Sequence, residues 1–335
     1  MSSNPRACIL GVAGLALTAE ERAFFAEAQP LGFILFARNI EAPPQVRVLV
    51  ESLRAAVGRP DAPVLIDQEG GRVARLRPPH WHALPAAARI AGLSPAQAEQ
   101  AAWLAGRLIA HDCAGLGIDV ACAPVLDVFQ PGARTNVIGD RSFGSDPGIV
   151  ARLGRAMAEG LLAGGVLPVA KHLPGHGRAH VDSHVALPAV DTAREELERT
   201  DFVPFRALND LPLGMTAHIV FGRIDREAPA TQSAAVIAEI IRGSIGFGGF
   251  LVSDDLCMAA LGGSFRERAE MSLAAGCDAV LHCNANLDEM RDVAAAAHEL
   301  SGEAWERWQR IDRPQAMDFD GEEAAARLAS LLVLV

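Results

Sequence analysis

The sequence has no run of lysine and arginine, no closely spaced pair of cysteines, and no apolar stretch as long as a membrane span. Acidic residues outnumber basic ones by 41 to 30, and the formal net charge of −11 is opposite to the positive surface that nucleic acids require. Anionic membrane surfaces are disfavoured for the same reason, and no apolar run approaches ~20 residues. We therefore expect no nucleic-acid partner and no membrane association.

The six cysteines are scattered and form no CxxC motif, which is typical of reduced thiols in a reducing compartment. One stretch imitates a secretion signal, because Arg6 is followed by the apolar segment 7–17. We interpret this segment as a strand, since few charges precede it and since the strand count below requires it.

Half of the residues are hydrophobic, only 5% are aromatic and 21% are charged, which predicts a globular chain with a sizeable core. Short apolar runs of four to eight residues recur along the chain and alternate with helical patterns. None of them alternates with polar residues, which is typical of parallel strands that are buried on both faces. The eight runs are 8–12, 32–36, 64–67, 118–124, 166–172, 213–218, 250–254 and 279–283.

Eight strands alternating with helices predict an α/β fold of the single-domain (β/α)8 TIM-barrel type. An open doubly wound sheet is the alternative, but residues 11–14 lack the GxGxxG spacing expected after its first strand. Only 52 residues follow the last run, too few for a second sheet domain. We predict one catalytic domain over residues 1–335, with C-terminal covering helices from about residue 284.

Polar residues follow five of these runs, and the active site of such a barrel lies at the C-terminal ends of its strands. A single polar residue there is as easily a cap or a solvated loop, but five together indicate a site. The residues are Asp67, Lys171 with His172, His218, Asp254 with Asp255, and His282.

The segment 171–184 carries four histidines at intervals of four residues. On a helix they would share one face and suggest zinc, but Pro174, Gly175 and Gly177 favour a loop, so we expect no metal site. In such a loop Asp182 could hold His184 as a general acid and base, although this spacing alone, which has little specificity, favours a solvated pair. A serine nucleophile is disfavoured, because no GxSxG motif surrounds Ser183.

Five motifs in order resemble glycoside hydrolase family three, and the Asp-Ser-His segment narrows the resemblance to the NagZ-type β-N-acetylglucosaminidases (β-N-acetylhexosaminidases). The resemblance covers roughly positions 8 to 285. The motifs are DQEGGRVAR at 67–75, VIGDRSFG at 137–144, KHLPGHG at 171–177, DSH at 182–184 and SDDLCM at 253–258.

The resemblance implies a cytoplasmic, monomeric enzyme without cofactor or metal. It would remove terminal β-linked N-acetylglucosamine from peptidoglycan-derived muropeptides in cell-wall recycling, as a retaining exo-glycosidase with a covalent glycosyl-aspartate intermediate. By the same resemblance, Asp254 is the nucleophile, His184 the proton donor and acceptor, and Asp182 its partner. The implied sugar-binding residues are Asp67, Arg75, Arg141, Lys171 and His172.

Two departures from the family pattern are mild. Leu173 stands where the family often has phenylalanine, and the chain has no tyrosine, which removes one kind of platform for a sugar ring. Other activities of the family remain open: β-glucosidase, β-xylosidase or glycoside phosphorylase. A more distant alternative is a sugar-binding barrel without turnover, which the intact Asp254 and His184 disfavour.

Overall fold

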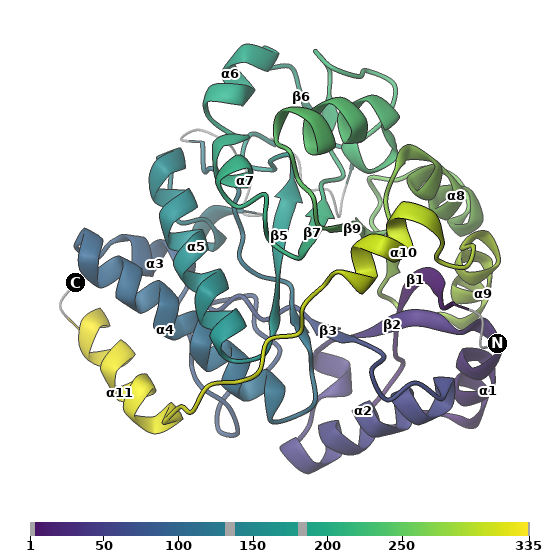
Figure 1. Ribbon diagram of the computed structural model, residues 1–335, viewed down its shortest axis with the longest axis horizontal. Helices are drawn as coiled ribbons and strands as arrows, with labels where there is room; N and C mark the ends of the chain where they lie inside the picture. The colour runs from purple at the N-terminus through teal and green to yellow at the C-terminus, as the bar shows by residue number, and fades with distance from the viewer. Residues whose placement is uncertain (1–3, 131–137, 180–185, 334–335) are drawn as a thin grey trace.

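The computed structural model describes residues 4–130, 138–179 and 186–333. Its centre is a closed barrel of parallel strands (Figure 1), in which each strand pairs with the next and β10 pairs with β1. The (β/α)8 TIM-barrel prediction is confirmed, because each of the eight apolar runs overlaps one strand of the barrel. The strands are β1 (Arg6–Gly11), β2 (Pro30–Leu35), β3 (Val64–Ile66), β4 (Val120–Ala121), β5 (Leu167–Leu173), β7 (Leu213–Thr216), β9 (Phe250–Asp255) and β10 (Ala279–His282).

Helices connect these strands, and capping side chains fix the starts of several of them. Thr18 forms a complete capping box with Glu21, and Asp146 accepts the N–H groups of Gly148 and Ile149 at the start of its helix. The longer helices are α1 (Ala19–Ala28), α2 (Pro43–Val57), α4 (Pro95–Ala114), α5 (Pro147–Ala163), α8 (Phe265–Ala275), α9 (Leu287–Ala296), α10 (Gly302–Gln309) and α11 (Gly321–Leu332).

Short elements fill the remaining connections. The helices are α3 (Ala87–Ala91), α6 (Arg194–Arg199) and α7 (Val203–Ala207), with 3-10 turns η1 (Ala37–Asn39), η2 (Gly139–Arg141) and η3 (Ala230–Gln232). A π-helix, η4 (Val236–Ser244), precedes β9. Two residues of β6 (Ala189–Val190) pair with β8 (Val220–Phe221) in a separate small sheet.

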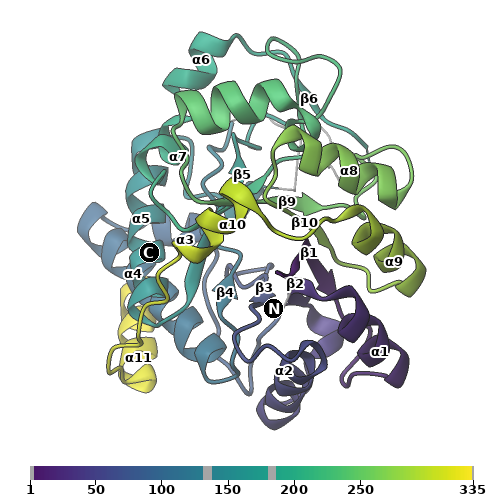
Figure 2. The same cartoon turned by 45° about the vertical axis from the view of Figure 1, so that its right-hand side comes forward.

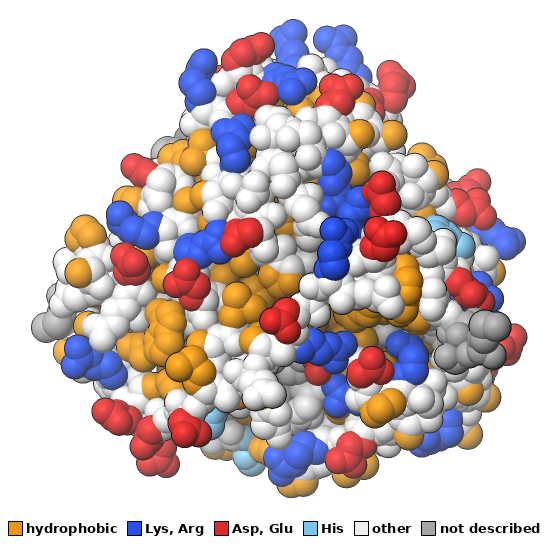
Figure 3. Space-filling model, viewed as in Figure 1, with side chains coloured by type: hydrophobic (Ala, Val, Ile, Leu, Met, Phe, Trp, Pro, Cys, Tyr) orange, Lys and Arg blue, Asp and Glu red, His pale blue; other side chains and the backbone are white. Residues whose placement is uncertain are grey.

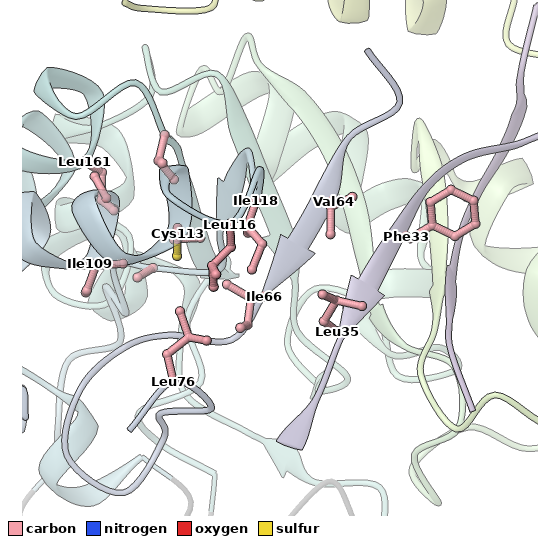
Figure 4. Close-up of a cluster of buried hydrophobic side chains, with 14 of the residues drawn as sticks. Phe33, Leu35, Val64, Ile66, Leu76, Ile109, Cys113, Leu116, Ile118 and Leu161 are labelled. Atoms are coloured by element: carbon pink, nitrogen blue, oxygen red, sulfur yellow. The ribbon is translucent and has the colours of Figure 1, made fainter. Parts of the chain in front are cut away.

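The core has an inner and an outer layer, because successive side chains of a strand point to opposite sides of the sheet. Leu65, Val252 and Leu281 belong to the cluster inside the barrel. Val64 and Ile66 of β3 point the other way and pack against the helices, together with Ile109 and Cys113 of α4 (Figure 4). This alternation decides which residues of a strand reach the interior.

The C-terminal segment crosses the end of the barrel opposite the C-terminal ends of the strands. It runs from α9 through α10 to α11, as both views show (Figures 1 and 2). Trp308 of α10 packs edge-on against Phe250, the first residue of β9, with 5.2 Å between ring centroids. Three helices, α9, α10 and α11, thus follow the last barrel strand.

The visible surface mixes acidic and basic side chains without a block of one sign (Figure 3). Among the described residues, no helix combines the length and the hydropathy that crossing a membrane requires.

Candidate active site

A polar cavity of about 220 Å³ lies at the C-terminal ends of the barrel strands. Its lining includes Asp67, Arg75, Arg141, Lys171, His172 and Asp254, so the structure brings together the described residues that the family resemblance assigns to the site. His184 and Asp182 lie outside the described residues. The cavity is smaller than the ~300–1,000 Å³ of sites for drug-sized ligands, and this size suits one sugar ring.

Lys171 binds two carboxylates at the inner rim of the barrel. Lys171 lies on the same side of β5 as Leu167 and Val169, which belong to the cluster inside the barrel. Its side chain is 2% exposed. The Nζ atom lies 3.0 Å from Asp67 Oδ1 and 2.6 Å from Glu69 Oε1. Burial works to lower the pKa of Lys171, but these two carboxylates outweigh it and raise the pKa, so the ammonium stays charged.

Glu69 also holds Arg141 in a two-pronged ion pair. The Nε and one terminal nitrogen of Arg141 each lie 2.8 Å from a different oxygen of Glu69. Burial works to raise the pKa of Glu69, but Lys171 and Arg141 together lower it to about 2. The sequence placed Glu69 within a motif without giving it a role, and its contacts identify it as the residue that positions both cations.

Asp67 joins the same network from β3. Its second oxygen, Oδ2, lies 3.2 Å from a terminal nitrogen of Arg75. Burial works to raise the pKa of Asp67, but Lys171 and Arg75 outweigh it, and the pKa lies below its usual value. Asp67 is thus an anionic acceptor between two cations, a geometry suited to the hydroxyl groups of a neutral ligand.

Asp254 and Asp255 point to opposite sides of β9, as the alternation predicts. Asp254 continues the inward series of Phe250 and Val252. The Asp255 carboxylate is held by the segments that follow β9 and β10. Its Oδ1 accepts the backbone N–H of Cys257 at 2.9 Å and that of Cys283 at 3.1 Å. The Asp254 carboxylate accepts the backbone N–H of Asp255 at 2.8 Å.

The Asp254 carboxyl is held in its ionised form. Burial works to raise its pKa, but the neighbouring His172 and His218 and the N–H of Asp255 outweigh it, and the pKa lies below its usual value. His218 is fully buried next to the end of β9. Its ring nitrogens make hydrogen bonds with Thr231 Oγ1, at 2.7 Å, and with the Asp255 carbonyl oxygen, at 2.9 Å. It therefore positions the end of β9.

Asp127, which was not among the residues predicted from the sequence, fixes the orientation of His172. This fully buried carboxylate lies 2.7 Å from His172 Nδ1 and accepts the backbone N–H of His176, also at 2.7 Å. With Nδ1 used in this pair, Nε2 is the nitrogen of His172 left for a ligand in the cavity. A single aspartate in the apolar run 125–128 was the signal available in the sequence.

Two residues of the predicted polar ring, His218 and His282, do not line the cavity. His282 does not line the cavity, because its position on β10 turns it outward to Glu289 of α9, 3.1 Å away. Phe36 lines the cavity and supplies an aromatic surface for a sugar in a chain that has no tyrosine. The guanidinium groups of Arg38 and Arg75 lie 4.9 and 5.4 Å from the centroid of its ring.

The charges that line the cavity balance. Four carboxylates and four cations line it: Asp67, Glu69, Asp254 and Asp255, with Arg72, Arg75, Arg141 and Lys171. Such a cavity favours a neutral ligand with many hydroxyl groups over an ion, and places an ionised carboxylate beside it.

The depressed pKa of Glu69 predicts a specific loss of stability in acid. The unfolded carboxyl titrates near 4.5 and the folded one near 2. Its stabilisation is therefore complete above pH 4.5 and is lost as the pH falls towards 2. It amounts to a few kcal/mol, on the order of 3.

Urea unfolding at pH 7, 5 and 3 measures this loss. We expect Glu69→Gln to be less stable than the parent at pH 7, with a difference that shrinks by pH 3. The control Glu27→Gln, at the exposed surface of α1, should follow the parent at all three values. A Glu69→Gln difference that stays constant with pH would show that the ion pairs do not depress this pKa.

Comparisons with known proteins agree with this site. A barrel with a charge-balanced, sugar-sized cavity and an ionised carboxylate at its rim fits the class of glycoside hydrolases. The family model described as glycosyl hydrolase family 3 N terminal domain matches residues 8–313, and the chain belongs to this family.

Curated relatives and solved structures extend the comparison. A protein of Alkalilimnicola ehrlichii named beta-hexosaminidase is 42% identical over 283 residues, which cover 82% of this chain and 80% of that protein. The native NagZ of Neisseria gonorrhoeae is 33% identical, with a TM-score of 0.87 and 98% of each chain covered. Its complex with N-trifluoroacetyl-D-glucosamine gives 34% identity and a TM-score of 0.82, and covers 98% of this chain and 99% of that one.

Proposed function

We propose that this β-N-acetylhexosaminidase is an exo-acting, retaining enzyme that removes terminal β-linked N-acetylglucosamine. The observation that carries the proposal is the ionised Asp254 at the inner rim of a small cavity, in which Asp67, Glu69, Arg75, Arg141 and Lys171 form ion pairs with one another. Two findings support the proposal. Relatives that are more than 40% identical are named beta-hexosaminidase, and a similar solved structure binds a glucosamine derivative.

The nucleophile follows from the position and charge of Asp254. A retaining glycosidase needs a carboxylate below the anomeric carbon that is ionised before the sugar arrives. Asp254 points into the cavity and its pKa is depressed, so it meets both needs at neutral pH. In the first step its oxygen forms a bond to the anomeric carbon while the bond to the leaving oxygen breaks. In the second step, water displaces the carboxylate.

Proton transfer is proposed for His184, with Asp182 as its partner. Imidazole titrates near pH 6.5, so it can donate a proton to the leaving oxygen and then accept one from water near neutral pH. A second carboxylate would need its pKa raised by burial to do the same. The proposal rests on the Asp-Ser-His motif, because both residues lie outside the described part of the chain.

The paired charges hold the hydroxyl groups of the sugar. Lys171 and Arg141 are fixed by Glu69, and Asp67 is fixed by Lys171 and Arg75, so their spare donors and acceptors are aimed before the sugar binds. Such preorganised hydrogen bonds accelerate the reaction when they tighten at the oxocarbenium-like transition state.

The proposed cellular role is the release of N-acetylglucosamine from muropeptides during peptidoglycan recycling. We place the enzyme in the cytoplasm as a monomer, since the motif resemblance implies this setting and the scattered cysteines suit a reducing compartment. The proposed partner is the sugar substrate, without nucleic acid, membrane or cofactor.

A panel of aryl β-glycosides tests the sugar and the reaction together. We expect kcat/KM for the N-acetylglucosaminide to exceed those for the glucoside and xyloside by at least about tenfold, the discrimination of one good polar contact. Turnover should be the same with and without phosphate, and with and without EDTA. Faster release with phosphate would indicate a phosphorylase, and a preferred glucoside or xyloside would overturn the proposed sugar.

A further inference from the structure

Three side chains that are typical metal ligands meet on the outer side of the barrel wall, away from the sugar cavity. They are Cys257, in the turn after β9, His282, the last residue of β10, and Glu289, in the first turn of α9. One ligand atom from each lies within 4.8 Å of the other two. In the described ranges 4–130, 138–179 and 186–333, this is the one group of three or more such residues at that distance.

Two of the three ligands are already held in place. His282 is fully buried, and its Nε2 lies 3.1 Å from Glu289 Oε2. Asn284 donates a hydrogen bond to the same oxygen. The ring of Phe265 packs edge-on against the imidazole, with 5.2 Å between centroids, so the ring cannot turn freely. Ligands fixed in this way bind a metal with little loss of conformational entropy.

The imidazole of His282 is nevertheless incompletely satisfied. Its Nδ1 is buried and has no hydrogen-bond partner in the described structure. A buried polar nitrogen without a partner costs about 1–3 kcal/mol, and native proteins seldom leave such a group without a reason. The ring nitrogen that faces Glu289 is Nε2, so Nε2 is the one placed to bind an ion together with Glu289.

The ligand set favours zinc among the common divalent ions. Thiolate, imidazole and carboxylate are all zinc ligands, whereas magnesium and calcium prefer oxygen alone. Ligand atoms around a tetrahedral zinc lie roughly 3.3–3.7 Å apart, given bond lengths of about 2.0–2.3 Å. Atoms within 4.8 Å of one another reach this spacing by shifts of about 1 Å. The fourth position is left to water.

We propose that Cys257, His282 and Glu289 bind one zinc-type ion at a site separate from the sugar cavity. The ion lies outside the barrel wall and takes no part in glycoside cleavage. The site nevertheless touches the catalytic strand, because the backbone N–H groups of Cys257 and of Cys283, next to His282, both hold Asp255. Filling it stabilises the ends of β9 and β10 against unfolding.

Zinc and cobalt titrations of the chelator-treated enzyme test the proposal. Calorimetry should give one zinc ion per chain, and bound zinc should raise Tm. Cobalt in the same site should show a thiolate-to-metal charge-transfer band, and because Cys283 lines the sugar cavity, the Cys257 variant assigns the band to one site or the other. Cys257→Ser should abolish the band, and Glu289→Gln should weaken zinc binding at least about tenfold. Both residues are partly exposed, so neither change empties the core.

Asp288→Asn is the matched control, since Asp288 is the acidic neighbour of Glu289 in the same helical turn and is 92% exposed. It should bind zinc like the parent. Three results overturn the proposal: no zinc bound at micromolar concentrations, a cobalt spectrum without the thiolate band, or a band that survives Cys257→Ser. Zinc that N-acetylglucosamine displaces would belong to the sugar cavity instead, and would equally overturn it.

Discussion

Asp254→Ala is expected to reduce kcat on an activated aryl N-acetylglucosaminide by on the order of 10³-fold or more, because both steps of a retaining reaction pass through that carboxylate. This loss is equivalent to at least about 4 kcal/mol of transition-state stabilisation. A good leaving group cannot rescue it, since the missing group is the one that attacks. The measurement is steady-state kinetics, with circular dichroism to confirm that the variant is folded.

Asp255→Asn is the matched comparison, because it changes the neighbouring carboxylate on the opposite face of β9. Asp255 holds the N–H groups of Cys257 and Cys283, so its loss should lower Tm and reduce kcat much less than the loss of Asp254. If Asp255→Asn instead abolished turnover while Asp254→Ala retained it, the assignment of the inward residue would be wrong.

His184→Ala is expected to show a large effect that depends on the leaving group. An alkyl or sugar leaving group needs a proton as it departs, so its kcat should fall by about 10²–10⁴-fold. A dinitrophenolate departs without a proton, so the first step on that substrate should be spared. The comparison of both substrates across the pH range measures this difference.

Asp182→Ala should resemble His184→Ala in weaker form, because the carboxylate orients and charges the ring without itself transferring the proton. Added azide is a further check, because this anion can attack the anomeric carbon in place of water without a general base, displace the Asp254 carboxylate and release a glycosyl azide, which restores the second step. Equal losses on both substrates would contradict the acid–base role and leave the loop a binding role only.

The barrel could be predicted from the sequence because its strands are buried on both sides. A strand buried on both sides needs apolar residues in an unbroken run, and each of the eight runs overlaps a strand in the structure. The polar residues at the C-terminal ends of those runs likewise indicated the site, since a charge at the end of a buried strand is unfavourable unless it is paired. Lys171 is the clearest example, because it is the only lysine in the chain and binds two carboxylates.

Glu69 and Asp127 were missed because their roles depend on partners distant in sequence. Glu69 lies 72 residues from Arg141, and Asp127 lies 45 residues from His172. Nothing local to either carboxylate reveals such a pairing. His282 was predicted to belong to the polar ring because it ends a strand. However, the side chains at the end of a strand face either the interior of the barrel or the surrounding helices. Only the register of β10, with Val280 in the outer layer, shows that His282 faces the helices.

Trapping of the glycosyl-enzyme tests the central claim most directly, because it reports the covalent bond itself. Incubation with a 5-fluoro derivative of N-acetylglucosaminyl fluoride slows both steps and lets the ester accumulate when the second step is slower. Mass spectrometry of the digested protein should find one added sugar on the peptide around residues 252–258, with fragmentation placing it on Asp254. A label on Asp255 or on any other residue, or an inverted product with no label, would contradict the account.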